Sequence, residues 1–204
     1  MLIAGTANFS FLKIDTPKSG FSHILNLRKY PAMMAYYVVG IGVLCSNNKS
    51  VLEEITTHTI IHPTHDGKTT IFNLLRPSRV IHHSLAANLF TNNRKFPIND
   101  YIFQSLIQLL PSDIIIPSFE EVFDQFEIFL SIYNLNLQLP PDFDLDIQIA
   151  PILGCFAYKE NEMKKLIDDT ELNGLSSCLG RTGLFSDMER LVKILKLLDN
   201  FLVN

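Results

Sequence analysis

The stretch SFEEVFDQFEIFLSIY, Ser118–Tyr133, decides the fold. Its apolar residues recur every three to four positions, which is the spacing that places side chains on one face of an α-helix. Ser118 and Glu121 have the spacing of a capping box, so we expect the helix to begin at Ser118. Leu139-Pro140-Pro141 ends the pattern, because proline has no backbone N–H to donate. The aromatic stripe that contains Phe126 predicts a face buried in a core.

A second helix is expected from Ala32 to Cys45, where almost every residue is apolar. A helix that is apolar on all sides is typical of complete burial. Pro31 suits its first turn, and Gly40 and Gly42 remove side chains so that a neighbouring backbone can come close. The run is about 14 residues long, whereas a membrane-spanning helix needs about 20. We therefore expect a core helix.

Weaker patterns along the rest of the chain complete the fold class. They predict helices around Leu52, from Pro77 to Leu89, from Tyr101 to Leu110 with Asn99 or Asp100 as its cap, from Tyr158 to Leu172, and from a second capping box, Ser186 with Glu189, to the carboxyl end. Residues 142–147 alternate with period two, as in a short edge strand or an extended connector. The sequence therefore predicts an all-α, mainly helical fold with minor short strands, arranged as an irregular multi-helix bundle. A single helical domain, residues 1–204, accounts for the length, with 1–20 as an irregular lead-in that can be the end of a linker from an upstream domain.

Composition excludes several classes of function. Hydrophobic residues make up 47% and charged residues 19% of the chain, which favours a packed globule over disorder. The net charge of −4 and the scattered basic residues argue against nucleic-acid binding, and no export signal or membrane span is evident. Cys45, Cys155 and Cys178 form no CxxC pair and lie in mainly apolar surroundings, which indicates reduced structural thiols and a cytoplasmic protein.

The strongest candidate for chemistry is a histidine cluster, His58, His62 and His65 with Asp66. Imidazoles four positions apart share a helix face and can bind zinc or iron together with a carboxylate, so a metal-dependent hydrolase is one alternative. Pro63 interrupts such a helix, however, and no glutamate lies between the first two histidines. We expect an exposed polar turn that holds no metal.

Other short motifs lack residues that their chemistry needs. The aspartates at 142, 144 and 146 are not followed by the glycine and glutamate of a calcium loop, and Gly174–Gly183 has neither the glycine spacing nor the lysine of a P-loop. Cys155 and Ser177 have no base placed beside them by the sequence. We therefore expect no catalytic residue, no cofactor and no enzyme.

Four segments, in order, resemble a known family. They are LRKYPA followed by YYVVGIG at Leu27–Gly42, FDQFEIFL at Phe123–Leu130, LGCFAY at Leu153–Tyr158, and GLF at Gly183–Phe185. This order is similar to the carboxy-terminal helical region of prokaryotic sirtuin-like and NTPase-bearing antiphage defence proteins. Cys155 and Tyr158 depart from that pattern, where arginine and tryptophan are expected. The effector half of such proteins is absent from this chain, and no catalytic residue carries over.

The resemblance implies a non-enzymatic sensor, regulatory or assembly module of a bacterial antiviral defence protein. Such a module acts through protein contacts on an effector domain or a protein partner, and a homo-oligomer remains open. The alternative is a free-standing binding protein such as a toxin-neutralising immunity protein. Tyr36 and Tyr37 point about 100° apart on their helix. Burial of both rings inside this chain is the default expectation; in the alternative, one ring enters the core while the other serves an interface, where tyrosine is favoured.

Overall fold

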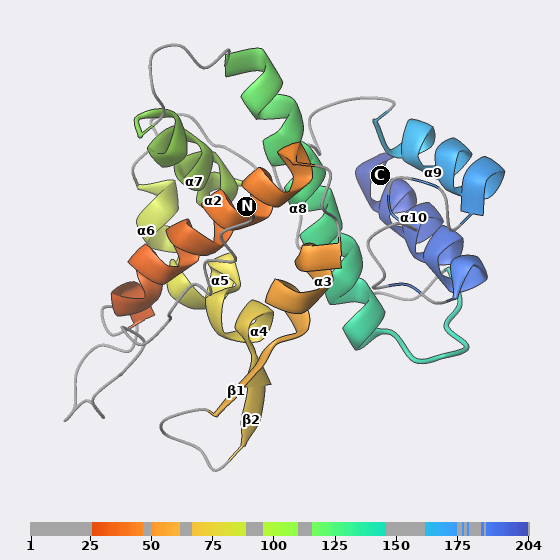
Figure 1. The fold of residues 1–204 in the computed structure, drawn as a ribbon, viewed down its shortest axis with the longest axis horizontal. Coiled ribbons are helices and arrows are strands. Elements are labelled where there is room, and N and C mark those ends of the chain that lie inside the picture. Colours follow the sequence, from red (N-terminus) through yellow and green to blue (C-terminus); the bar gives the residue numbers. More distant parts are fainter. Residues whose placement is uncertain are drawn as a thin grey trace, which may run out of the picture.

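The fold is a helical bundle with one small hairpin. The computed structural model describes residues 26–46, 50–61, 67–88, 96–109, 116–145, 162–174, 177, 179, 185 and 187–203. Its elements in chain order are η2 (Leu27–Lys29), α2 (Tyr30–Cys45), α3 (Ser50–Thr57), β1 (Thr59–Ile61), β2 (Lys68–Thr70), α4 (Ile71–Leu75), α5 (Pro77–Val80), α6 (His83–Ala87), α7 (Pro97–Ile107), α8 (Ile116–Gln138), α9 (Glu162–Asn173) and α10 (Met188–Val203). The predicted all-α class is confirmed (Figure 1).

Helix α8 is the longest element of the described chain and lies at its centre. It packs against α2 on one side and against α10 on the other, and α9 lies beside α10 at the edge of the molecule (Figure 1). The short helices α3 to α7 surround α2. Helix α10 buries one face and leaves the other in water, whereas residues 126–135 of α8 are buried on every side because α8 lies between α2 and α10.

The contact between α2 and α8 is aromatic and very close. The Phe126 ring lies 5.7 Å from the Tyr36 ring and 5.2 Å from the Tyr37 ring, measured between centroids. A Cβ atom built on Gly40 would lie only 2.2 Å from Cε2 of Phe126, so a glycine is required there. The expected close approach is therefore confirmed at Gly40. At Gly42 it is wrong, because that glycine is exposed and a Cβ atom would meet nothing within 4 Å.

Three helix starts differ from the capping patterns. Helix α8 begins at Ile116, so Ser118 lies in its first turn and is not the cap; Pro117 suits this earlier start. Helix α7 likewise begins at a proline, Pro97. At α10 the capping side chain is Asp187, whose Oδ1 accepts a hydrogen bond from the Arg190 N–H at 2.9 Å, while Ser186 lies outside the described residues.

The predicted helix from Pro77 to Leu89 is wrong, because the chain breaks into α5 and α6. Ile81 between them is extended, with φ −110° and ψ 125°. His82 caps α6 by accepting a hydrogen bond from the Ser84 N–H at 3.4 Å. As a result Val80 and Ile81 are buried while Leu85 is largely exposed.

The small sheet lies where no strand was expected. Strands β1 and β2 pair in antiparallel register, Thr59 opposite Thr70. Residues 142–145, the described part of the alternating segment, form a connector without a strand, and Phe143 is buried between exposed Asp142 and Asp144. The lead-in 1–20 lies outside the described residues.

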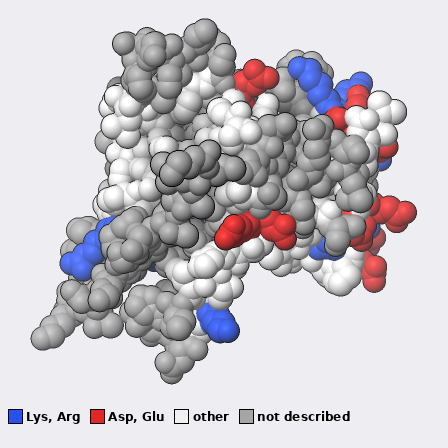
Figure 2. Space-filling view, viewed as in Figure 1, with Lys and Arg blue, Asp and Glu red and all other residues white. Residues whose placement is uncertain are grey.

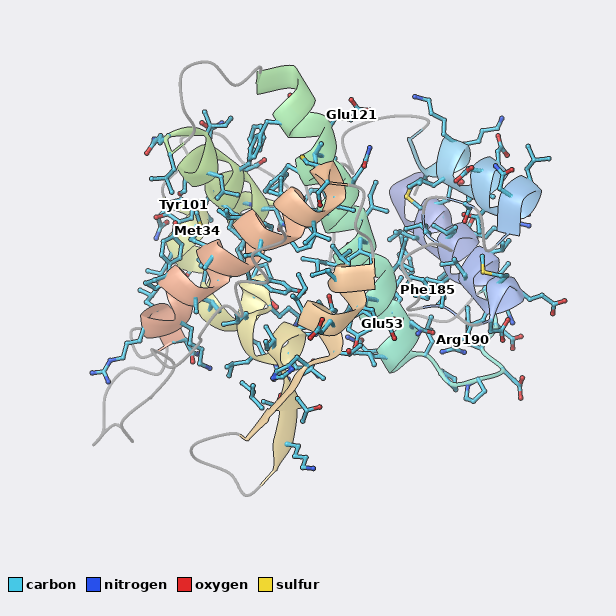
Figure 3. The ribbon with its side chains drawn as sticks, viewed as in Figure 1. Met34, Glu53, Tyr101, Glu121, Phe185 and Arg190 are labelled. Carbon is cyan, nitrogen blue, oxygen red and sulfur yellow. The ribbon has the colours of Figure 1, made fainter. Side chains whose placement is uncertain are left out.

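Arg190 fastens α10 to the end of α8. Its Nε donates a hydrogen bond to Asn136 Oδ1 at 2.7 Å. The terminal nitrogen Nη2 donates to the backbone carbonyls of Asn136 and Leu139, and Nη1 donates to the backbone carbonyls of Pro140 and Pro141. All five N–H groups of the guanidinium are thereby used. Figure 3 shows this side chain at the point where the chain leaves α8. The positive charge also suits a helix carboxyl end, where carbonyl dipoles are exposed.

Among the described helices, none has both the length and the apolar character needed to cross a membrane.

Candidate functional site

Tyr36 and Tyr37, the predicted interface residues, are both buried inside this chain. Their exposed fractions are 2% and 1%. Thr56 Oγ1 lies 3.4 Å from the Tyr36 hydroxyl and itself donates to the Leu52 carbonyl at 2.6 Å, so the Tyr36 hydroxyl is the donor of this pair. Burial raises the pKa of Tyr36 well above its ordinary value. Both rings are therefore enclosed by this chain, which is the default expectation for them.

The exposed side of α2 is formed by other residues. Val38 is 55% exposed, and Gly42 and Cys45 lie on the same side of the helix and are also exposed. Cys45 is a free thiol in contact with solvent, so the apolar surroundings expected for it are wrong. Cys155 and Cys178 lie outside the described residues.

The histidine cluster does not share a helix face. Helix α3 ends at Thr57 and β1 begins at Thr59, so the chain is extended on leaving His58. His62, His65 and Asp66 lie outside the described residues. In the part of the chain that the structure describes, no three His, Cys, Asp or Glu side chains gather as metal ligands.

A small polar cavity lies inside the core between α2, α4, α7 and α8. Asn99 Nδ2 donates a hydrogen bond to Glu127 Oε1, and both residues are buried. Because α7 begins at Pro97, Asn99 and Asp100 lie within its first turn, and neither is the residue that caps it. The cavity has a volume of about 10 Å³, which holds one water molecule and no substrate. It is part of the scaffold.

A groove of about 460 Å³ separates the end of α9 from the start of α10. This volume lies within the range of ligand sites in proteins. Its lining is mainly apolar with charged residues at its edges, and it comprises Thr170, Glu171, Gly174, Met188, Glu189, Val192, Lys193 and Lys196. Gly174 ends α9 with φ +51°, a left-handed conformation that suits glycine after a helix.

The polar groups that line the groove differ in the contacts they make. Lys196 Nζ lies 2.6 Å from Glu171 Oε1, and this ion pair links the two helices across the groove. Lys193 Nζ lies 4.6 Å from the centroid of the Phe143 ring, which holds its side chain against the connector after α8. The Thr170 hydroxyl is buried and makes no hydrogen bond. Because buried hydroxyls almost always have a partner, this group is available to one supplied by an occupant.

Sequence reasoning did not find this groove. Met188 and Val192 belong to the apolar stripe of α10, which the sequence assigns to the core, and Leu191, Leu195 and Leu198 of that stripe are fully buried. Met188 and Val192 are only partly buried, at the edge of the same stripe. An apolar stripe wider than its buried centre is the one signal that could have indicated a groove.

No protein-family model, no curated protein and no solved structure matches this chain. Two of the four segments that carry the family resemblance contact each other, since Gly40 packs on Phe126. Packing alone accounts for glycine and phenylalanine at these positions. Leu153–Tyr158 lies outside the described residues, as does Gly183–Leu184, while Phe185 is buried.

Proposed function

We propose that this chain is a non-enzymatic binding module that receives an amphipathic helix of a protein partner in the α9–α10 groove. The observation that carries the proposal is the groove itself, with its apolar lining and its buried Thr170 hydroxyl. Recognition of a helix in an apolar groove needs no catalytic group, and it depends on apolar anchors spaced three to four residues apart.

The chemistry of the groove suits a helix better than a small polar ligand. Met188 and Val192 offer apolar surface, and methionine adapts its shape to different anchors. Charged side chains of both signs, Glu189 and Lys193 among them, stand at the edge, where the polar flanks of an amphipathic helix would meet them. The Thr170 hydroxyl can donate to a polar atom of the occupant.

The sequence resemblance supplies the biological context of the proposal. On that basis the partner is an effector protein or effector domain of a bacterial antiviral defence system, and the module acts on it in the cytoplasm as a sensor, regulator or assembly factor. The support is the order of four short segments, two of which form the α2–α8 contact. No feature of the groove favours an immunity protein over this context.

The proposal can be tested with displayed helical peptides. A library of helix-forming peptides is selected on the wild-type protein alone, and the enriched peptides are then measured against Val192→Glu, which places a charge in the apolar lining. Enriched peptides should carry apolar residues at helical spacing, and Val192→Glu should raise their dissociation constant by about tenfold or more in fluorescence anisotropy.

A matched control separates the groove from general surface stickiness. Leu172 on α9 is 84% exposed and does not line the groove, so Leu172→Gln should change the dissociation constant by less than about twofold. If the library yields no peptide specific for the wild type, or if its peptides bind Val192→Glu equally well, the proposed function is wrong. Circular dichroism checks that both variants remain folded.

A further inference from the structure

Basic side chains from two separate elements meet where η2 contacts α5. Lys29 belongs to η2, Arg79 belongs to α5, and Arg76 immediately precedes α5. Lys29 and Arg76 are half-buried, while Arg79 is exposed. No carboxylate pairs with any of the three among the residues that the structure describes. In a chain of net charge −4, three such cations in one place are unusual.

Burial and the charge of Arg79 act on both of the other cations. Partial burial, followed by the charge of Arg79, lowers the pKa of Lys29. The same two causes, in the same order, lower the pKa of Arg76. Arg79 is therefore the common neighbour of the other two cations, and the cluster is destabilised by its own charge as it stands.

The hydrogen bonds of the two guanidinium groups leave most of their donors unused. Arg76 donates from one terminal nitrogen to Asn134 Oδ1 at 2.9 Å, and its Nε is buried without an acceptor. Arg79 donates to the Asn73 carbonyl at 3.3 Å. Both acceptors are neutral. An anion is the group that would satisfy the remaining donors and offset the repulsion.

We propose that Lys29, Arg76 and Arg79 form a binding site for the phosphate group of a small molecule. Guanidinium forks and an ammonium group match a compact oxyanion with two negative charges. An extended nucleic acid would need six or so contacts along a stripe, and three clustered cations in an acidic chain do not supply them. In the face that Figure 2 shows, basic side chains lie at the lower-left edge, below the centre and at the upper right, and acidic ones lie at the centre and right. The site is distinct from the α9–α10 groove and does not depend on it.

The test uses inorganic phosphate and the melting temperature of the full chain. At about pH 8, where phosphate carries two charges, its addition should raise the melting temperature of the wild type with saturation. Sodium chloride at equal ionic strength should not reproduce this rise. Glycerol phosphate should act like inorganic phosphate, because the site is open to solvent at Arg79.

Arg79→Gln and Arg28→Gln form a matched pair of variants. Arg28 lies next to Lys29 and is exposed. Its charge is not among the causes that lower the pKa of Lys29 or of Arg76. Arg79→Gln should weaken apparent phosphate affinity by about tenfold or more, and without phosphate it should melt no lower than the wild type because a repulsion is removed. Arg28→Gln should keep the affinity within about twofold.

Three outcomes would overturn the proposal. One is a chloride effect equal to that of phosphate, and another is unchanged affinity in Arg79→Gln. The third is tighter binding of citrate than of phosphate, which would assign the cluster to the carboxylates of an acidic partner.

Discussion

The two sides of α8 differ in the kind of side chains that pack against it. Towards α2 the contact is aromatic, and it leaves so little space that Gly40 has no room for a methyl group beside Phe126. Towards α10 the contact is aliphatic, centred on Leu191, Leu195 and Leu198, and it is held at one end by the hydrogen bonds of Arg190. The first side has a cavity of about 10 Å³ among its described residues, whereas on the second side a groove of about 460 Å³ lies between α9 and α10.

This difference separates scaffold from candidate binding surface. A close-packed aromatic contact resists change, because any shift of one ring displaces several others. A pair of helices held by an aliphatic stripe and one ion pair can adjust its spacing when an occupant enters. We therefore expect mutations on the α2 side to act on stability, and mutations at the groove to act on binding.

The largest effect should come from Phe126, the residue at the centre of the aromatic side. Its exposed fraction is 0%, so Phe126→Ala removes a full ring from the core and should lower the free energy of unfolding by about 3 to 5 kcal/mol. Urea denaturation measures the change. A loss below about 1 kcal/mol would contradict the placement of this helix face.

Gly40 and Gly42 allow a paired test of close packing on one helix. Gly40→Ala should destabilise the protein by about 1 to 3 kcal/mol, because the new methyl group overlaps the Phe126 ring. Gly42→Ala should stabilise it by up to about 1 kcal/mol, since alanine favours helix and nothing lies nearby. Equal effects of the two substitutions would show that the close approach at Gly40 is absent.

Arg190 tests the other side of α8. Arg190→Met keeps an apolar stem but removes five hydrogen bonds, and it should lower the free energy of unfolding by about 1 to 3 kcal/mol. Hydrogen exchange should increase first in residues 139–145.

Lys193→Met is the control for Arg190→Met, because both side chains place a cation over the Phe143 ring and Lys193→Met removes that contact alone; it should lose about 1 kcal/mol or less. A loss for Arg190→Met no larger than that of Lys193→Met would mean that the hydrogen bonds of Arg190 contribute little.

The smallest effect concerns the Tyr36 hydroxyl. Tyr36→Phe should cost about 0.5 to 1.5 kcal/mol at pH 7, since one buried hydrogen bond to Thr56 is lost. The folded-state pKa of Tyr36 is raised, so its stabilising contribution is fully present below about pH 10 and is lost as the pH rises further.

The alkaline loss of stability should therefore be smaller in Tyr36→Phe than in the wild type, when urea unfolding is compared at about pH 7 and about pH 11. The variant should still lose some stability at alkaline pH, because burial also raises the pKa values of Tyr30 and Tyr133. Identical pH profiles of the two proteins would argue against the buried hydroxyl.

The helices that were predicted best are those whose own sequence has a clear amphipathic pattern. The stripes of α8 and α10 were recognised because polar residues alternate with apolar ones at helical spacing. In α2 nearly every residue is apolar, so nothing in the pattern distinguishes the buried Tyr36 and Tyr37 from the exposed Val38 and Gly42. Which residues of α2 are buried is decided by the helices that pack around it.

Helix starts and the candidate site depend on more than local pattern. Pro97 and Pro117 begin helices a few residues before the expected caps, because their fixed φ already suits a first turn. The α9–α10 groove depends on how two consecutive helices pack against each other, and the burial of both Tyr36 and Tyr37 depends on the helices around α2. The Lys29, Arg76 and Arg79 cluster joins segments that are separate in the chain.

The contact between Gly40 and Phe126 has a consequence for synthesis of the protein. Phe126 follows Gly40 by 86 positions in the chain. At the usual rate of translation, α2 is made roughly 4 to 17 s before the ring that covers it. During that interval α3, α4, α5 and α7 can already contact α2, but the face that Phe126 covers stays exposed, so we expect the nascent chain to be a substrate for chaperones until α8 has left the ribosome.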